Sequence, residues 1–176
     1  MEHNPLTVMY NEHDVIVKAE NIIKSLENTW EDTPETYVEK VKLLIEFFRE
    51  YADGYHHRKE EDVLFPAVHN HPDFVLQEII EEFNTHHEDF REYATEIIEA
   101  VDEEDYVRSY KVLKQYIGDL LDHIAAENDE LFVLAESLMD EQDLETIYFK
   151  FKDIDMELGE ERKQEFEEMI GSWGEK

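Results

Sequence analysis

The sequence predicts an all-α protein. The chain has 176 residues but only 5 glycines and 4 prolines, so long stretches contain no residue that would interrupt a helix. Apolar residues recur every three or four positions along these stretches, which places them on one face of a helix. A chain of this length forms one ordinary domain with enough residues to bury a core. We therefore expect several long helices joined by short connections.

The apolar spacing predicts helices in four successive regions. The first helix is expected from about residue 6 to residue 26, and the second starts at Pro34, since proline is favoured in the first turn. Pro66 near the end of the second helix is expected to stop or kink it. The third and fourth helices are expected over about residues 73–101 and 106–139.

A further apolar repeat follows Asp140. It predicts one amphipathic helix that ends at Gly159 and a short helix after it. We expect this segment to pack across the preceding helices or to mediate self-association, as in a homodimer. The predicted domains are a helical bundle over residues 1–139 and a C-terminal extension over residues 140–176. The apolar repeat of the extension comprises Leu144, Ile147, Phe151, Ile154, Leu158, Phe166 and Ile170.

The charge balance excludes several classes of partner. The formal net charge is −31, from 47 acidic and 16 basic residues, and such a surface repels nucleic acid and anionic lipid. No apolar stretch approaches the roughly 20 residues that cross a membrane, and the N-terminus lacks the pattern of a secretory signal. We expect an acidic cytoplasmic protein that binds neither nucleic acid nor membrane.

Two segments share one motif, in which histidine is followed four residues later by glutamate and then, after three residues, by Leu-Phe. These segments begin at His56 and His123. Residues four apart lie on the same face of a helix, so each segment offers an imidazole beside a carboxylate. His57 and Glu61 have the same spacing, but their face extends back through acidic residues and is expected to be solvated. The sequence therefore favours His56 and Glu60, and by the same register His123 and Glu127, as the inward pairs.

Histidine also falls on the apolar face of the other two helices. His13 lies there in the first helix, and either His86 or His87 in the third, because helical periodicity cannot separate these neighbours. Two carboxylates buried without partners would be strongly unfavourable, and no lysine or arginine falls on the predicted inward rows. The sequence has no cysteine, so a compensating metal would have nitrogen and oxygen ligands, which suit iron or manganese and, less distinctively, zinc.

These motifs resemble the hemerythrin-like family of His-His-Glu cation-binding proteins. The resemblance rests on His13, the segment 56–66, the turn that starts at His87, and the segment 123–132, in an order similar to the ligand order of that family. It covers about residues 5 to 138 and matches the C-terminal segment more loosely. It implies an up-down-up-down four-helix bundle with additional C-terminal helices.

The same resemblance implies a non-haem diiron centre, with other divalent metals as an alternative. Glu60 and Glu127 would bridge the two irons beside an oxo or hydroxo group. By analogy His87 fits better than His86. The implied metal ligands are His13, His56, Glu60, His87, His123 and Glu127.

The implied function is binding or sensing of a small diatomic ligand, either oxygen or nitric oxide. The alternatives are a redox enzyme that acts on peroxide or nitric oxide, and a protein that delivers iron for repair. Oxygen-carrying hemerythrins have a further histidine where this chain has Phe83, which favours ligand exchange and redox chemistry over reversible oxygen carriage. A ferritin-like site fits less well, because the Glu-x-x-His motif of that class is absent.

Overall fold

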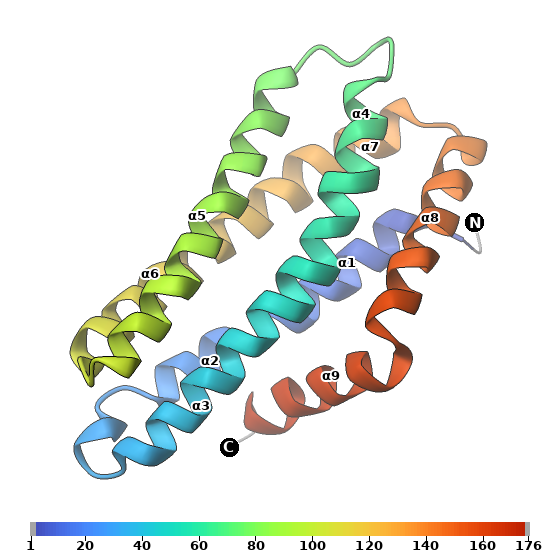
Figure 1. Cartoon of the computed structure of the whole chain (residues 1–176). Coiled ribbons are helices and arrows are strands. Elements are labelled where there is room, and N and C mark those ends of the chain that lie inside the picture. The colour runs from blue at the N-terminus through green and yellow to red at the C-terminus, as the bar shows by residue number, and fades with distance from the viewer. Residues whose placement is uncertain (1–2, 175–176) are drawn as a thin grey trace.

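The computed structural model describes residues 3–174, and within this range the chain is all-α, as predicted. It contains helices and short connections, with no strand among the described residues. None of the helices formed by residues 3–174 is long and apolar enough to cross a membrane. Figure 1 shows long helices packed side by side, with the C-terminal helices against one flank of this bundle.

The first predicted helix is divided into two. Helix α1 (Pro5–Ile16) is followed by a turn and by α2 (Ala19–Ser25). The side chain of Asn4 caps α1 by accepting a hydrogen bond from the backbone N–H of Leu6, which satisfies one of the free donors at the start of a helix. This cap fixes the beginning of the helix that carries His13.

The second predicted helix is one continuous helical rod that contains two π-helical segments. We call each such rod of the bundle a column. It begins with α3 (Pro34–Phe47) and passes through the π-helical segments η2 (Phe48–His57) and η3 (Glu60–Leu64) before it ends in α4 (Phe65–His69). A π-helix bonds residue i to residue i+5, so it has more residues per turn than an α-helix and is often found at functional sites. Pro66 lies in the first turn of α4 and does not end the column.

The third and fourth columns lie against each other. Helix α5 (Gln77–Asp102) packs along α6 (Tyr106–Ala126), which continues as the π-helical segment η4 (Glu127–Leu131) and as α7 (Phe132–Leu138). The second half of the repeated sequence motif therefore has the same backbone in both copies, whereas His56 lies in a π-helical segment and His123 in an α-helix. In each copy the glutamate is the first residue of a five-residue π-helical segment, and the phenylalanine begins the next α-helix.

The C-terminal extension consists of α8 (Glu141–Leu158) and α9 (Glu160–Gly174). Helix α8 packs against α1, η2 and η3, and α9 packs against α1 and α2. Apolar residues of both helices, including Phe151 and Phe166, are buried in the common core. The extension therefore covers the face of the first two columns, on the side away from α5 (Figure 1). Residues 1–2 and 175–176, which belong to the two predicted domains, lie outside the described residues.

Candidate metal centre

The six residues predicted as metal ligands come together in the middle of the bundle. His13 is contributed by α1, His56 by η2, His87 by α5 and His123 by α6, and each is at most 2% exposed. Between the rings lie two carboxylates that are fully buried, those of Glu60 and Glu127. His86, the alternative to His87, is outside this cluster and is partly exposed. The register of α5 therefore favours His87.

The cluster divides into two groups, each compact enough to hold one ion. Within each group, one potential ligand atom from every residue lies within 4.8 Å of the others. Glu60 is common to both, with Oε1 at 3.2 Å from Nε2 of His56 and Oε2 at 3.2 Å from Nε2 of His87. We call them the His56 group, which is His13, His56, Glu60 and Glu127, and the His57 group, which is His57, Glu60, His87 and His123.

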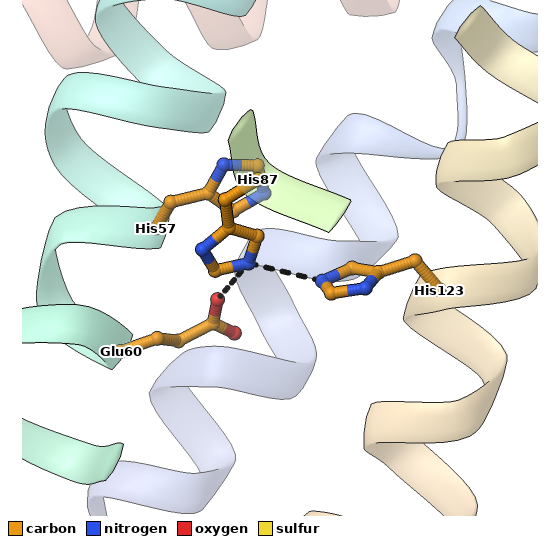
Figure 2. A group of neighbouring side chains, drawn as sticks. All are labelled: His57, Glu60, His87 and His123. Atoms are coloured by element: carbon orange, nitrogen blue, oxygen red, sulfur yellow. Dashed lines mark hydrogen bonds and ion pairs between the residues drawn. The ribbon is translucent and has the colours of Figure 1, made fainter. Parts of the chain in front are cut away.

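His57 was not among the predicted ligands, and its expected place on a solvated face is wrong. Its side chain is 2% exposed, and its ring stacks on that of His87 with 3.8 Å between centroids. Figure 2 shows His57, Glu60, His87 and His123 converging from three columns of the bundle. The expectation failed because it assumed α-helical spacing, whereas the π-helical turn at η2 carries two consecutive histidines inward. The consecutive histidines were the only sequence signal for this residue.

A hydrogen-bond acceptor outside the cluster holds the Nδ1 atom of four of the five histidines. The acceptors are the side-chain oxygens of Asn128 for His13, Glu12 for His56, Asp53 for His57 and Glu61 for His87, at 2.7–3.2 Å. Because these oxygens accept, Nδ1 carries the proton, and in a neutral ring the Nε2 lone pair is free. Such contacts typically orient histidines that bind metals.

The fifth histidine, His123, is held by His86. Their Nδ1 atoms are 3.0 Å apart, so one ring donates to the other. On the opposite edge, Nε2 of His123 lies 3.0 Å from Glu127 and 3.0 Å from Nε2 of His87. His86 therefore contributes to the site from outside the cluster, by contacting His123.

The pKa values show how the cluster is balanced without a metal. Although burial alone would lower the pKa of His56, Glu60 and Glu12 raise it to about 10. Burial likewise opposes protonation of His87, but Glu60 and Glu61 raise the pKa of this ring to about 9. Burial and the neighbouring His87 lower the pKa of His57 to about 3. A metal that binds here therefore replaces protons on His56 and His87 and finds His57 already neutral.

The two central carboxylates have only histidine partners. Burial and mutual repulsion would raise the pKa of Glu60, but His56 and His87 lower it; in the same way His123 and His13 lower the pKa of Glu127. All four oxygens of these two carboxylates lack a hydrogen-bond donor among the described residues. Two buried carboxylates surrounded by imidazole nitrogens are a donor set that could hold metal dications once the rings are neutral.

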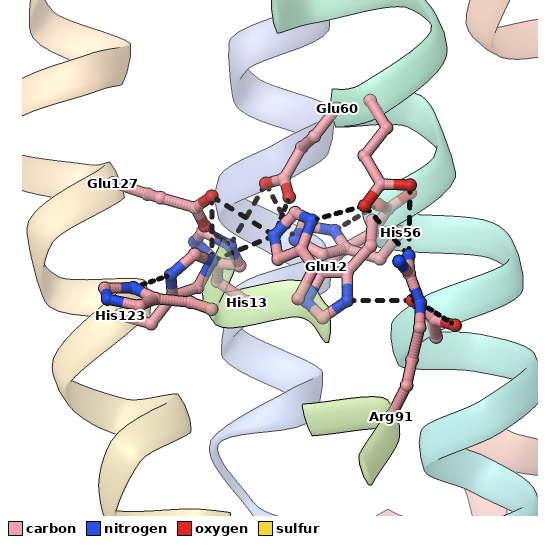
Figure 3. Close-up of polar contacts among 12 residues, drawn as sticks. Glu12, His13, His56, Glu60, Arg91, His123 and Glu127 are labelled. Atoms are coloured by element: carbon pink, nitrogen blue, oxygen red, sulfur yellow. Dashed lines mark hydrogen bonds and ion pairs between the residues drawn. The ribbon is translucent and has the colours of Figure 1, made fainter. Parts of the chain in front are cut away.

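Lys59 lies outside the predicted inward rows, but its side chain is fully buried. Its ammonium group pairs with Glu12 and, at 2.7 Å, with Asp155. The guanidinium of Arg91 binds Asp53 and Glu61, which hold His57 and His87. Neither cation pairs with Glu60 or Glu127, so histidines are the only charge partners of these two carboxylates among the described residues. Figure 3 shows the polar contacts around the cluster, including that of Glu12 with His56.

Two cavities reach the cluster from the surface. One of about 490 Å³ lies between α5 and α6 and extends to His123; its lining includes Phe83 and His86 together with carboxylates. The other, of about 200 Å³, extends to His57 and has Arg49 and Arg91 in its lining. Small molecules and ions therefore have approaches of different charge to the two sides of the His57 group.

The bundle and its buried cluster of imidazoles and carboxylates define a helical protein that binds metal cations. The family model for the hemerythrin HHE cation-binding domain matches residues 4–135. The chain therefore belongs to the hemerythrin HHE cation-binding family. In comparisons with curated proteins and with solved structures, no match to the chain was found.

Proposed function

We propose that the chain is a non-haem diiron protein that binds or senses a small diatomic ligand, either oxygen or nitric oxide. In this proposal one ion lies in the His56 group and one in the His57 group, on an up-down-up-down four-helix bundle. The observation that carries the proposal is the set of five buried histidines that surround two carboxylates without donors. Iron suits this mixed nitrogen and oxygen donor set, and a reduced iron pair supplies electrons to a bound ligand.

The residues around the cluster support ligand binding in three ways. Glu12, Asp53 and Glu61 fix the histidine rings through Nδ1, so the ligand atoms are oriented before a metal arrives. Apolar rings next to the cluster, those of Phe83 and Phe90, lie 5.1 and 5.3 Å from the His123 ring and limit the access of water. The cavity at His123 gives a small neutral molecule a path from solvent.

A redox enzyme that acts on peroxide or nitric oxide is the second candidate. The cavity at His123 favours it, because a volume of about 490 Å³ admits reactants larger than a diatomic molecule and allows product to leave. In reversible binding the ligand leaves the site chemically unchanged, whereas in turnover it is converted to a product that leaves and is replaced by new reactant. The two functions therefore differ in the fate of the ligand.

Anaerobic reduction of the iron-loaded protein followed by exposure to air separates these functions. Reversible binding gives an oxygen-dependent absorption band that disappears under vacuum. Redox catalysis gives irreversible oxidation together with turnover of added peroxide or nitric oxide. An iron content near zero after anaerobic reconstitution would contradict both functions.

The role of Glu60 gives the sharpest test by substitution. Glu60→Gln removes the charge that both groups share, so we expect the protein to lose both ions, as measured by metal analysis after gel filtration. Glu61→Gln is the matched control on the adjacent residue. It disturbs the contacts of Glu61 with His87, at 2.9 Å, and with Arg91 but leaves Glu60 in place, so we expect affinity to fall about 10- to 100-fold without loss of the site. Equal losses in the two variants would be inconsistent with a shared Glu60.

A further inference from the structure

Lys59 is a fully buried cation that lies outside the two metal groups. It belongs to the same column as His56 and Glu60, but its ammonium group points toward α1 and α8. The Tyr55 ring lies 3.7 Å from Nζ, and the Phe151 ring of α8 lies 5.5 Å away. Burial of a lysine is costly unless it is paired, and the carboxylates of Glu12 and Asp155 provide that pairing.

These contacts form a chain from the C-terminal extension to a metal group. Asp155 on α8 binds Lys59 at 2.7 Å, and Lys59 binds Glu12 of α1. Glu12 in turn accepts a hydrogen bond from Nδ1 of His56 at 2.8 Å. Each link is at least three-quarters buried, since Asp155, the most accessible, has a side chain that is 23% exposed. The orientation of the His56 ring therefore depends on a residue about a hundred positions away.

The His57 group is held by a different set of residues. Its histidines contact Asp53, Glu61 and His86, and Arg91 of α5 binds both Asp53 and Glu61. None of these contacts among the described residues involves α8 or α9. The two groups thus have separate supports, one from the C-terminal extension and one from the third column.

We propose that Lys59 and Asp155 are positioning residues for the His56 group, through which the C-terminal extension sets the metal affinity of one of the two positions. Asp155 holds the ammonium group of Lys59 in place, and Lys59 fixes the Glu12 carboxylate. Glu12 then keeps the His56 ring turned so that Nε2 faces Glu60. This inference rests on the proposed function to the extent that it requires two metal positions.

Anaerobic titration of the full-length protein with ferrous or cobaltous ion tests this inference. We expect wild type to bind two ions, and Asp155→Asn to weaken one of the two positions by about 10-fold or more while the other keeps its affinity. Asp153→Asn is the matched control, because Asp153 is exposed on the same helix and should leave both affinities unchanged. Wild type that binds no metal would contradict the proposed function itself. If both positions bind as tightly in Asp155→Asn as in wild type, only this inference is overturned.

A double variant separates positioning from folding. Lys59→Met leaves Glu12 buried without its cation and is expected to destabilise the chain. Combining it with Glu12→Gln removes the charge while the amide oxygen still accepts from His56. If Lys59 acts through Glu12, the double variant binds metal as tightly as Glu12→Gln alone. A further loss of affinity in a folded double variant would contradict the proposed chain of contacts.

A spectroscopic readout distinguishes positioning from general destabilisation. In the cobalt-loaded protein the Nδ1 proton of a ligand histidine gives a paramagnetically shifted resonance that exchanges with solvent. In Asp155→Asn we expect faster exchange of the His56 proton, while the His87 proton, held by Glu61, keeps its rate. Equal acceleration of both protons would indicate a loosened bundle and overturn the assignment.

Discussion

His57 adds a fifth imidazole that the repeated motif does not contain. It is neutral, buried and stacked on His87, so its nitrogen is available to a metal without the loss of a proton. Oxygen-carrying hemerythrins have a further histidine at the position of Phe83, whose ring packs against His123 in this chain. His57 partly makes up for the imidazole that is missing at that position. The number of nitrogen donors is therefore larger than the sequence motif indicates.

Substitution of this residue by an aromatic ring of similar shape tests its role. His57→Phe keeps the stack on His87 but removes both ring nitrogens, so we expect the metal content to fall by one ion while the fold is retained. Metal analysis and circular dichroism measure the two outcomes. His69→Phe, at an exposed position in α4, serves as the control. Full metal content in His57→Phe would show that the ring only packs.

Ionisation of Tyr37 is expected to make the free energy of unfolding fall as pH rises through the alkaline range. Its hydroxyl pairs with Ser109 at 2.7 Å, and burial raises its pKa to about 12. In the unfolded chain this group ionises near pH 10, so between about pH 10 and 12 the unfolded state binds fewer protons. The stabilisation that Tyr37 contributes is therefore fully present below pH 10 and is lost as pH rises toward 12. We expect urea unfolding of Tyr37→Phe to show a shallower loss of stability over this range.

Ser109→Ala is the matched control for Tyr37→Phe. It removes the same hydrogen bond but retains the phenol, so its alkaline loss of stability should resemble that of wild type. At pH 8 both variants should be destabilised by about 1 kcal/mol, the usual contribution of one hydrogen bond. Identical alkaline slopes in all three proteins would rule out Tyr37 as the source.

At the scale of elements, the sequence predicted the helices well but not their internal geometry. The predicted fourth helix and α6 both begin at residue 106, and α8 ends before Gly159 as expected. Periodicity could predict these limits because proline, glycine and capping residues mark helix ends locally. The π-helical segments have no such local signal, since they arise where packing around the cluster stabilises a wider turn. The error at His57 followed directly from this missing information.

Contacts between elements explain the other parts of the site that the sequence did not predict. Glu12 and Lys59 come from different helices, and their pairing depends on α8 covering both. Periodicity within one helix gives no information on a partner in another helix, so it could not predict the burial of Lys59. The ligand pairs could be predicted because each pair lies within one helix at a spacing of four residues.

Gly118 provides a test at the scale of a single helix. It lies in the middle of α6 at an exposed position, and a Cβ there would meet no atom within 4 Å. Alanine restricts the unfolded chain and favours the helix, so we expect Gly118→Ala to stabilise the protein by about 0.5–1 kcal/mol. Urea denaturation measures the change, and metal content should stay the same. A loss of stability would contradict the open surroundings of this position.

At the scale of the whole molecule, the net charge of −31 opposes compaction. Like charges on the surface repel each other, and salt screens them by reducing the Debye length from about 30 Å at 0.01 M to about 3 Å at 1 M. We therefore expect the melting temperature of the metal-free protein to rise with sodium chloride over this range, as followed by circular dichroism.

A variant with fewer exposed carboxylates is the control for this salt effect. Glu39, Glu99 and Glu145 are exposed on three different helices, and replacing all three by glutamine lowers the repulsion. The triple variant should melt at a higher temperature than wild type at low salt and should gain less from added salt. A melting temperature that is independent of salt in both proteins would show that repulsion between surface carboxylates does not limit stability.

The doubled motif also has a consequence for the equivalence of the two ions. Exchanging the copies exchanges His56 with His123 and Glu60 with Glu127, a pseudo-twofold relation that would make both ions alike. His57 breaks this relation, because the corresponding residue of the second copy is Ile124. If both groups bind a metal as proposed, the His56 group would supply two imidazoles and the His57 group three, so the two ions would differ electronically. In the proposed diiron centre, one iron would then be easier to oxidise than the other.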